Sequence, residues 1–183
     1  MNFIKTKIDG VFIVEPRVFA DSRGYFFESY NMKDFIQNGI NANFVQDNQS
    51  KSSYGVIRGL HSQMGQYAQA KLVRVLRGTV LDVAVDARPG SPTFGQHVAV
   101  ELSAENNRQL YIPRGMLHGF SVLSDRAVFA YKCDNFYNKE SELGVRFDDP
   151  DLAIDWRIPA DKVIASEKDK IAKRFYDAFG HRR

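Results

Sequence analysis

Alternating apolar and polar positions dominate the middle of the chain. Between Thr79 and Asp86, Leu81, Val83 and Val85 share one face of an extended segment, and Asp82, Ala84 and Asp86 share the other. This period of two is typical of a β-strand. Similar short runs recur along the chain: Phe12–Val14, Tyr25–Tyr30, Lys71–Leu76, Val98–Leu102, Leu110–Ile112, His118–Leu123 and Ala127–Cys133. Many short strands at a spacing of about 8–12 residues predict an all-β sandwich or barrel.

Turn residues and helix signals punctuate this pattern. Turns are expected at 21–24, 77–78, 89–92 and 113–115, where glycine and proline gather. A short helix is predicted for 32–38, with Asn31 as its N-cap, Gly39 just past its end, and Phe35 and Ile36 on its buried face. The tail from Glu167 to Phe179 also predicts a helix, with 166–169 as either a loop or its first turn.

Composition narrows the class of protein. A chain of 183 residues fits one domain, 1–183, with a helical tail at about 167–183. The net charge of +3 is too small to indicate binding to nucleic acid. The basic residues of the C-terminal tail, and His181 with them, are expected to face water. No run approaches the ~20 apolar residues of a membrane helix, and the first ten residues do not form a signal peptide. We expect a cytoplasmic protein without a membrane partner.

Cysteine and histidine are scarce enough to consider singly. Cys133 is the only cysteine, which excludes an internal disulfide. His97 shares a strand face with a glutamate and is expected at the surface. His61 and His118 each lie beside a glycine in a compact loop–strand context, where glycine lets the backbone turn tightly near a pocket. Either histidine is a satisfied core residue or it belongs to a site.

The segment from Pro113 to His118 resembles the second conserved box of the cupin barrels. In metal-binding cupins the first box carries two histidines, and here the matching place reads His61, Ser62, Gln63. With Gln63 in place of the second histidine, a site of three or four nitrogen and oxygen ligands is hard to assemble. The resemblance therefore implies a cupin-type jelly-roll barrel with a few short helices, no metal and no cofactor, whose histidines serve acid–base chemistry.

Longer segments sharpen the resemblance when they are taken in order. They are 46–52, 55–61, 69–75, 91–95, 102–106, 112–115, 131–134, 148–150 and 166–169. In this order and spacing they resemble the dTDP-4-dehydrorhamnose 3,5-epimerase family over nearly the whole chain, from Phe12 to Asp169. That family inverts C3 and C5 of dTDP-4-dehydro-6-deoxy-D-glucose, giving dTDP-4-dehydro-L-rhamnose, and is dimeric. The resemblance implies an isomerase, a dTDP-sugar substrate and a homodimer.

The resemblance also implies a role for individual residues. His61 matches the base that abstracts the proton, and Asp169 matches its carboxylate partner. Lys71 matches the cation beside the C4 oxygen, and Tyr131 matches the proton donor on the opposite face of the ring. The matching substrate-binding residues are Arg23, Glu28, Gln46, Asn48, Arg58, His118, Tyr137, Glu142 and Lys168. Among these, His118 matches a sugar contact, Tyr137 the aromatic stacked on thymine, and some contacts cross the dimer.

These residue types suit the chemistry. A hydrogen α to a ketone is removed only if the enolate oxygen is stabilised, which Lys71 can do by a charge-assisted hydrogen bond. Inversion needs a second group opposite the base, and Arg58 can bind phosphates through two parallel hydrogen bonds. Taken singly, each residue also has an ordinary structural explanation: a surface lysine, a turn arginine, a helix-capping aspartate or a core tyrosine. For Glu142 and Lys168 that explanation remains open, because their surroundings are charged anyway.

Three positions depart from the family pattern. Ser62 follows the base where an aromatic residue is usual, the loop 64–68 lacks the usual proline, and Phe147 stands where tryptophan is usual. These positions are expected to line or border the pocket. The alternatives to a double epimerase are an enzyme that inverts one carbon of a related nucleotide sugar, a non-catalytic cupin that binds a sugar nucleotide, and a metal-dependent cupin oxygenase, which Gln63 disfavours.

Overall fold

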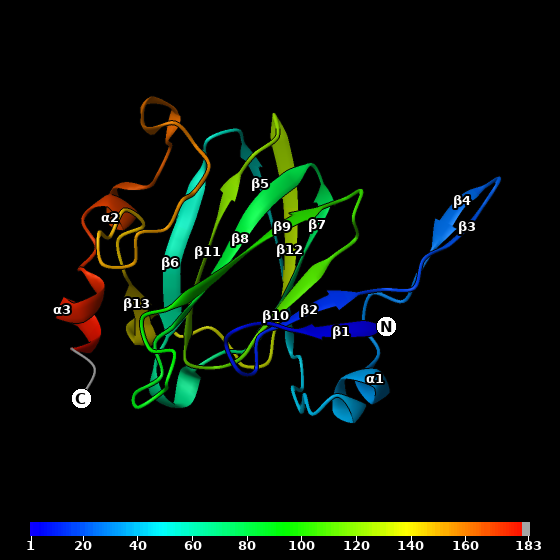
Figure 1. Cartoon of the computed structure of the whole chain (residues 1–183), viewed down its shortest axis with the longest axis horizontal. Helices are drawn as coiled ribbons and strands as arrows, with labels where there is room; N and C mark the ends of the chain where they lie inside the picture. The colour runs from blue at the N-terminus through cyan, green and yellow to red at the C-terminus, as the bar shows by residue number, and fades with distance from the viewer. Residues whose placement is uncertain (181–183) are drawn as a thin grey trace.

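Two β-sheets packed face to face form the body of the chain in a computed structural model that describes residues 1–180 (Figure 1). The first sheet has the strand order β1 (Asn2–Lys5), β2 (Phe12–Glu15), β10 (Gln109–Ile112), β7 (Lys71–Arg77), β12 (Arg126–Cys133), β5 (Gln46–Ser53). The second has the order β13 (Glu142–Gly144), β6 (Ile57–Gln63), β11 (Met116–Val122), β8 (Thr79–Asp86), β9 (His97–Ser103). Neighbouring strands in both sheets are antiparallel, which confirms the expected all-β class.

Four strands of these two sheets were not predicted from the alternating pattern: β1, β5, β6 and β13. The reason is clearest for β5, which reads Gln-Asp-Asn-Gln-Ser-Lys-Ser-Ser and has no apolar face. Its side chains nevertheless alternate between half-buried and exposed along most of the strand. Polar residues occupy its inner face because that face borders a cavity rather than the apolar core, so the period of hydrophobicity is missing.

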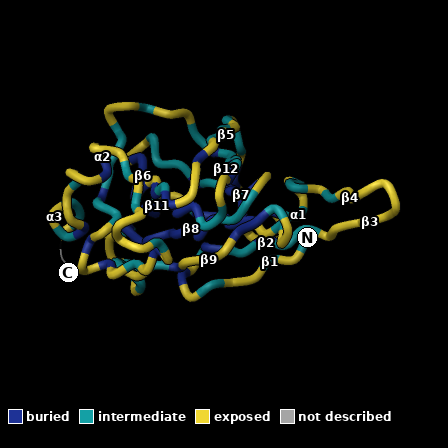
Figure 2. Tube along the Cα trace, turned by 90° about the horizontal axis from the view of Figure 1, so that it is seen from above, coloured by how far each residue is buried: buried dark blue, intermediate teal, exposed yellow. Residues whose placement is uncertain are grey.

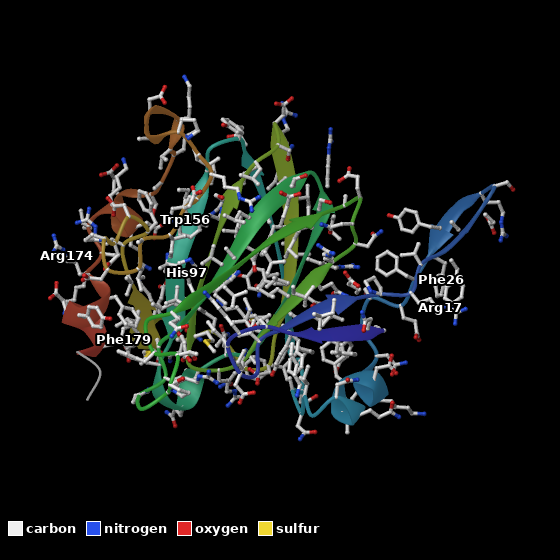
Figure 3. The ribbon with its side chains drawn as sticks, in the orientation of Figure 1. Arg17, Phe26, His97, Trp156, Arg174 and Phe179 are labelled. Atoms are coloured by element: carbon white, nitrogen blue, oxygen red, sulfur yellow. The ribbon has the colours of Figure 1, made fainter. Side chains whose placement is uncertain are left out.

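Apolar side chains gather in two main clusters on either side of the second sheet. The first fills the space between the two sheets and includes Val80, Val100 and Phe129. The second lies between the outer face of the second sheet and the C-terminal segment, where Trp156 and Phe175 pack (Figure 3). The interior strand β8 is consequently buried on both of its faces, as the dark blue segment in the middle of Figure 2 shows. A third cluster packs helix α1 (Met32–Gln37) against the first sheet.

The hairpin formed by β3 (Phe19–Asp21) and β4 (Gly24–Phe26) projects away from the barrel (Figures 1 and 2). Its turn at 21–24 is where the sequence predicts one. The aromatic side chains of Phe19, Tyr25 and Phe26 are more than half exposed, and Phe26 points into open space in Figure 3. The extended segment expected for Tyr25–Tyr30 is wrong beyond Phe26, since the strand ends there.

The helices are shorter than the sequence pattern suggests. In α1, Asn31 caps the first turn by accepting from the Lys33 N–H, and Phe35 is buried, as expected. The expectation that Ile36 is buried is wrong, because adjacent helical residues point about 100° apart and only one of them faces the sheet.

The continuous C-terminal helix expected from Glu167 is also wrong. The tail forms two short helices, α2 (Glu167–Lys170) and α3 (Phe175–Phe179), because Lys173 between them pairs with Val145 in a parallel bridge. His181 and the two final arginines lie outside the described residues. Among residues 1–180, no helix has the length and apolar character needed to cross a membrane.

Candidate active site

A cavity of about 630 Å³ opens between the two sheets at the end where the C-terminal segment folds over β6. Residues 164–166 form one wall, held to β6 by hydrogen bonds between Ile57 N–H and Ile164 O and between Ile164 N–H and Gly55 O. An adjoining cavity of about 310 Å³ shares several of its lining residues. The expected site residues that line one or both cavities are Gln46, Asn48, Arg58, His61, Lys71, His118, Tyr131, Tyr137, Glu142, Lys168 and Asp169.

Two glycines bring the strands that carry both histidines into close contact. His61 on β6 is directly opposite His118 on β11, and the register shifts between His118 and Phe120. At this point a Cβ on Gly59 would lie 2.6 Å from the Gly119 Cα, and a Cβ on Gly119 would lie 2.8 Å from the Arg58 carbonyl oxygen. Gly59 also has a φ of +129°, which larger residues rarely adopt. Glycine is therefore required here by contact distance and by backbone conformation.

His61 and Asp169 form a close pair at the cavity wall. The His61 Nε2 donates to Asp169 Oδ1 over 2.6 Å, which leaves Nδ1 as the nitrogen that accepts a proton. The carboxyl of Asp169 is buried while the imidazole is one-third exposed to the cavity. Burial raises the pKa of Asp169, but hydrogen bonds from His61, the positive charge that His61 can carry and the Ser166 hydroxyl outweigh it, so the pKa lies below its ordinary value. Asp169 is thus an anion suited to stabilise an imidazolium.

Helix α2 places Asp169, although the helix is only four residues long. Ser166 is its N-cap and accepts from the Asp169 N–H over 3.1 Å, as a capping hydroxyl does. The expected segment 166–169 is therefore a helical first turn rather than a loop. Because Asp169 follows Ser166 by three residues, the cap turns its carboxyl toward β6.

His118 forms a second pair, with Asp82, deeper in the barrel. Its Nε2 donates to Asp82 Oδ1 over 2.8 Å, and both side chains are almost wholly buried. Burial lowers the pKa of His118 in spite of the nearby Asp82 charge, with Lys71 and His61 lowering it further. The second carboxylate oxygen of Asp82 is buried without a hydrogen-bond partner among the described residues. The glycine beside His118 marks that residue in the sequence, and a carboxylate inside a largely apolar strand is a comparable signal for Asp82.

Tyr131 and Lys71 reach the cavity from the sheet opposite His61. They lie on the paired strands β12 and β7, with the Lys71 Nζ 5.8 Å from the centre of the Tyr131 ring. Burial raises the pKa of Tyr131, which keeps its hydroxyl a proton donor. Burial lowers the pKa of Lys71, and Cys133, Asp82 and Glu142 partly offset the shift. The cavity therefore has an imidazole on one wall, and a phenol beside a lysine amine on the other.

Polar side chains continue the site along β5 and β6. Gln46 donates to Asn48 over 2.9 Å, so the two amides form one unit on the inner face of β5. Arg58 on β6 is exposed and donates through Nε to the Ser52 hydroxyl over 3.1 Å. That bond orients the guanidinium at the cavity wall and leaves its terminal nitrogens for an anion.

Tyr137, Glu142 and Lys168 form a chain of contacts beside the cavities. Lys168 Nζ lies 2.6 Å from Glu142, and the Tyr137 hydroxyl donates to the other Glu142 oxygen over 3.3 Å. The bond to Lys168 lowers the pKa of Glu142 against the opposing effect of burial. Lys168 thus connects the C-terminal segment with the segment that carries Tyr137.

Arg23 and Glu28 are not brought to this site. Arg23 sits at the tip of the projecting hairpin and is paired with Asp21 over 2.6 Å. Glu28 is exposed beyond the hairpin and accepts from Asn31. Neither residue lines the cavities. The separation is physical: the hairpin carries Arg23 away from the barrel (Figure 1), and Glu28 lies in the connection between the hairpin and α1.

Of the positions that depart from the family pattern, one lies at the pocket and another does not. Ser62 lines the adjoining cavity. Phe147 does not border the pocket, so that expectation is wrong: it packs in the cluster beneath the C-terminal segment, where its carbonyl accepts from Trp156 over 2.7 Å. His97 is half-buried on β9 rather than freely exposed, and burial lowers its pKa.

The donor set around Gln63 does not favour a metal. Both hydrogens and the oxygen of the Gln63 amide are engaged by backbone groups of Tyr67, Phe136 and Asn138. Within the described part of the chain, no three histidine, cysteine, aspartate or glutamate side chains gather closely enough to hold a metal ion.

Comparison with known proteins identifies the family to which this chain belongs. The family model described as dTDP-4-dehydrorhamnose 3,5-epimerase matches residues 5–177. A protein of that name from Shigella flexneri is 54% identical over 179 residues, which cover 97% of this chain and 98% of the relative.

Two solved structures agree with it. The enzyme of that name from Elizabethkingia anophelis is 59% identical with a TM-score of 0.95, covering 98% of both chains. A dTDP-6-deoxy-D-glucose-3,5-epimerase from Legionella pneumophila, solved with dTDP-4-keto-L-rhamnose, is 53% identical with a TM-score of 0.91, covering 95% of this chain and 92% of that one. The expected cupin-type barrel and the expected isomerase are confirmed. This chain belongs to the dTDP-4-dehydrorhamnose 3,5-epimerase family.

Proposed function

We propose that this enzyme carries out its family's reaction, the conversion of dTDP-4-dehydro-6-deoxy-D-glucose to dTDP-4-dehydro-L-rhamnose, with His61 as the base and Tyr131 as the acid. The observation that carries the proposal is their placement on opposite sheets, facing one cavity. A sugar ring bound between the sheets presents one face to each residue. Removal of a proton by His61 and return of a proton by Tyr131 then inverts the carbon.

The C4 ketone supplies the acidity, and Lys71 makes it usable. When His61 removes the hydrogen at C3 or C5, the electron pair moves into an enolate whose negative oxygen is at C4. A protonated Lys71 donates to that oxygen inside a cavity with little water, where such a bond is stronger than in solution. The proton on His61 and the charge of Asp169 attract each other over their 2.6 Å contact, which stabilises the imidazolium. The reaction needs no cofactor, because only protons are exchanged and the substrate is neither oxidised nor reduced overall.

Binding of the nucleotide is assigned to the polar groups that surround this centre. Arg58, with the Gln46–Asn48 unit nearby, provides donors for the diphosphate, and an arginine can bind it through two parallel bonds. The exposed ring of Tyr137 provides a surface for the thymine base, and His118 provides a sugar contact from the cavity floor. The pair formed by Glu142 and Lys168 borders this region and can contact the nucleoside.

A homodimer explains the two residues that lie far from the cavity. The hairpin exposes Phe19, Tyr25 and Phe26, and a second copy of the chain would cover this apolar surface. In that arrangement Arg23 and Glu28 belong to the partner's site rather than to their own. We place the enzyme in the cytoplasm, where nucleotide sugars are made and a lone buried thiol such as Cys133 stays reduced.

Incubation with the 4-keto sugar in deuterium oxide tests the reaction. Deuterium at both C3 and C5, with inversion at both, is the expected result. Deuterium at one carbon alone would identify a single epimerase, and deuterium at neither would identify a protein that only binds the sugar nucleotide.

Mixing two inactive variants tests the dimer. Arg23→Ala and His61→Ala are each expected to be nearly inactive, since one lacks the crossing contact and the other the base. In a mixed dimer one site carries both defects and the other carries none, so mixing should restore activity. If Arg23→Ala is fully active, or if mixing restores nothing although mixed dimers form, then the contact does not cross between subunits.

A further inference from the structure

Gln63 has no part in the chemistry proposed above, yet its side chain is buried and makes three hydrogen bonds. Its Nε2 donates to the carbonyls of Tyr67 over 3.3 Å and Phe136 over 3.2 Å. Its Oε1 accepts from the Asn138 N–H over 2.9 Å. A primary amide has two hydrogens to donate, so both donors are used. Such a fully satisfied buried amide fixes the backbone groups that it contacts.

Two of these contacts lie immediately before and after Tyr137. The amide accepts from one flanking residue and donates to the other, as a neighbouring strand would, and so holds 136–138 in place. The third contact joins the same amide to the short helix η1 (Gly65–Tyr67). Gln63 itself is at the end of β6, two residues after His61. One side chain therefore connects the strand that carries the base with the segment that carries Tyr137.

Tyr137 has little else to define its position. The residue is 56% exposed, and its hydroxyl makes a single 3.3 Å hydrogen bond, to the Glu142 carboxylate that Lys168 also contacts. The other side-chain amide contacts of this segment hold Asn135, which precedes Phe136. Gln69 donates to the Asn135 carbonyl, and the Asn135 side chain donates to the Gln66 carbonyl. The backbone next to Tyr137 is held by Gln63, with Asn138 further anchored through Ser141.

We propose that Gln63 is a positioning residue for nucleotide binding: by holding the backbone on both sides of Tyr137, it sets the ring at the angle that receives the thymine base. This inference rests on the proposed role of Tyr137. A ring that is already in position does not have to be ordered when the nucleotide binds, so affinity for the dTDP moiety rises. The proton transfers at His61 do not depend on it. Where metal-binding cupins have a second histidine, this chain has a residue that organises the nucleotide site.

The test is a double-mutant cycle on dTDP affinity, measured by calorimetry on the intact enzyme. Gln63→Met keeps the side-chain volume and removes all three hydrogen bonds. Tyr137→Ala removes the ring, and since base stacking on an aromatic ring is commonly substantial, we expect a loss of about 5- to 150-fold. Gln63→Met should weaken dTDP by about 3- to 30-fold in the parent and by less than about twofold in Tyr137→Ala. In turnover, Gln63→Met should raise KM and leave kcat within about twofold.

Two further variants keep the test decisive. Ser121→Ala is the control: its buried hydroxyl also donates to a carbonyl, that of Trp156 over 2.7 Å, but it lines neither cavity, and dTDP affinity should stay within about twofold. If Gln63→Met fails to fold, Gln63→Glu replaces it, because it keeps the acceptor for Asn138 and sets a charged oxygen against two carbonyls. Gln63→Glu should lose at least as much affinity for dTDP as is expected for Gln63→Met.

The outcomes separate the two levels of the proposal. Parental dTDP affinity in Gln63→Met, or an equal loss in the presence and absence of the Tyr137 ring, overturns the positioning role while leaving Tyr137 as the stacking residue. Parental affinity in Tyr137→Ala overturns the proposed role of Tyr137 itself, and the inference about Gln63 falls with it.

Discussion

Two histidine–aspartate pairs have the same chemical groups in different surroundings, and their histidines lie opposite each other on neighbouring strands of one sheet. His61 and Asp169 meet at the cavity wall, with the imidazole one-third exposed and the carboxylate held by a helix cap. His118 and Asp82 meet inside the barrel, with both side chains buried and one carboxylate oxygen without a partner. Burial lowers the pKa of His118 and keeps that imidazole neutral.

This difference assigns the two pairs different work. A base must become charged and must reach the substrate, and His61 has both an open edge and a carboxylate anion to stabilise the charge. A buried neutral imidazole can donate or accept a hydrogen bond without changing its charge. In the proposed function, the same residue types therefore serve acid–base catalysis at one place and substrate contact at the other. Environment, not residue type, makes the distinction.

The largest loss of activity should come from removing His61, the more exposed of the two histidines. His61→Ala is expected to lower solvent exchange at both C3 and C5 by at least ~10²–10⁴-fold, the usual contribution of a general base. Mass spectrometry of the sugar after incubation in deuterium oxide measures it, with circular dichroism to show an intact fold. Exchange at the parental rate would mean that the base is another residue, and His118 would be the first to test.

Tyr131→Phe should separate deprotonation from inversion. It removes the hydroxyl opposite His61 while keeping the ring that packs against Phe129, so the fold should lose only about 1 kcal/mol. His61 and Lys71 remain, so protons are still removed and often return to their original face. We expect net inversion to fall by about 10²-fold at the carbon that Tyr131 serves, with deuterium exchange outlasting it. Normal inversion at both carbons would place the acid elsewhere, for example in a bound water or His118.

Matched carboxylate-to-amide variants compare the pairs directly. Asp169→Asn removes the charge that stabilises an imidazolium, and kcat should fall by about 10²-fold. Asp82→Asn keeps an acceptor for a histidine that stays neutral, and kcat should fall by less than about tenfold. Measurements of kcat for the two variants under saturating substrate decide the matter. Equal losses would mean that both imidazoles become charged during the reaction.

The low polarity of the barrel interior can be tested on a group outside both pairs. Burial raises the pKa of Cys133 from 9.0 to about 11. An unfolded thiol would ionise above pH 9 while the folded one keeps its proton, so stability from this group is complete below pH 9 and is lost as pH rises to 11. Chemical denaturation should show ~2–3 kcal/mol of this loss, which Cys133→Ala should lack. The same pH dependence in both proteins would show that the interior does not desolvate the thiol.

The smallest expected effect is that of chelation. Since backbone groups engage the Gln63 amide, we expect activity to be unchanged after exhaustive dialysis against a chelator. Neither histidine pair would then depend on a metal. A purified enzyme with stoichiometric zinc or iron, whose activity disappears with the metal and returns on its addition, would replace acid–base chemistry with metal chemistry for one pair.

Sequence pattern predicted much of this molecule from local properties. The alternation in 79–86, the turn at 21–24 and the cap at Asn31 depend on neighbours within a few residues, so they could be found without the fold. The ordered motifs identified the family, and they named His61 and Asp169 although the two are 108 positions apart. The pattern failed for β5, whose inner face is polar, and for the tail, where a bridge to Val145 interrupts a helical sequence.

Residue type, spacing and periodicity are properties of the chain alone, and they were enough to predict the all-β class, the family and the chemical groups available to the site. The sequence left open which face of β8 lies inside, and so whether Asp82 faces water or His118. Three features follow from the three-dimensional packing and not from the sequence pattern: both faces of β8 are buried, Gln63 holds the segment around Tyr137, and Arg23 lies away from its own cavity. Burial and desolvation depend on elements that are distant in sequence. They decide which of the two histidine–aspartate pairs has an imidazole that can take up a proton.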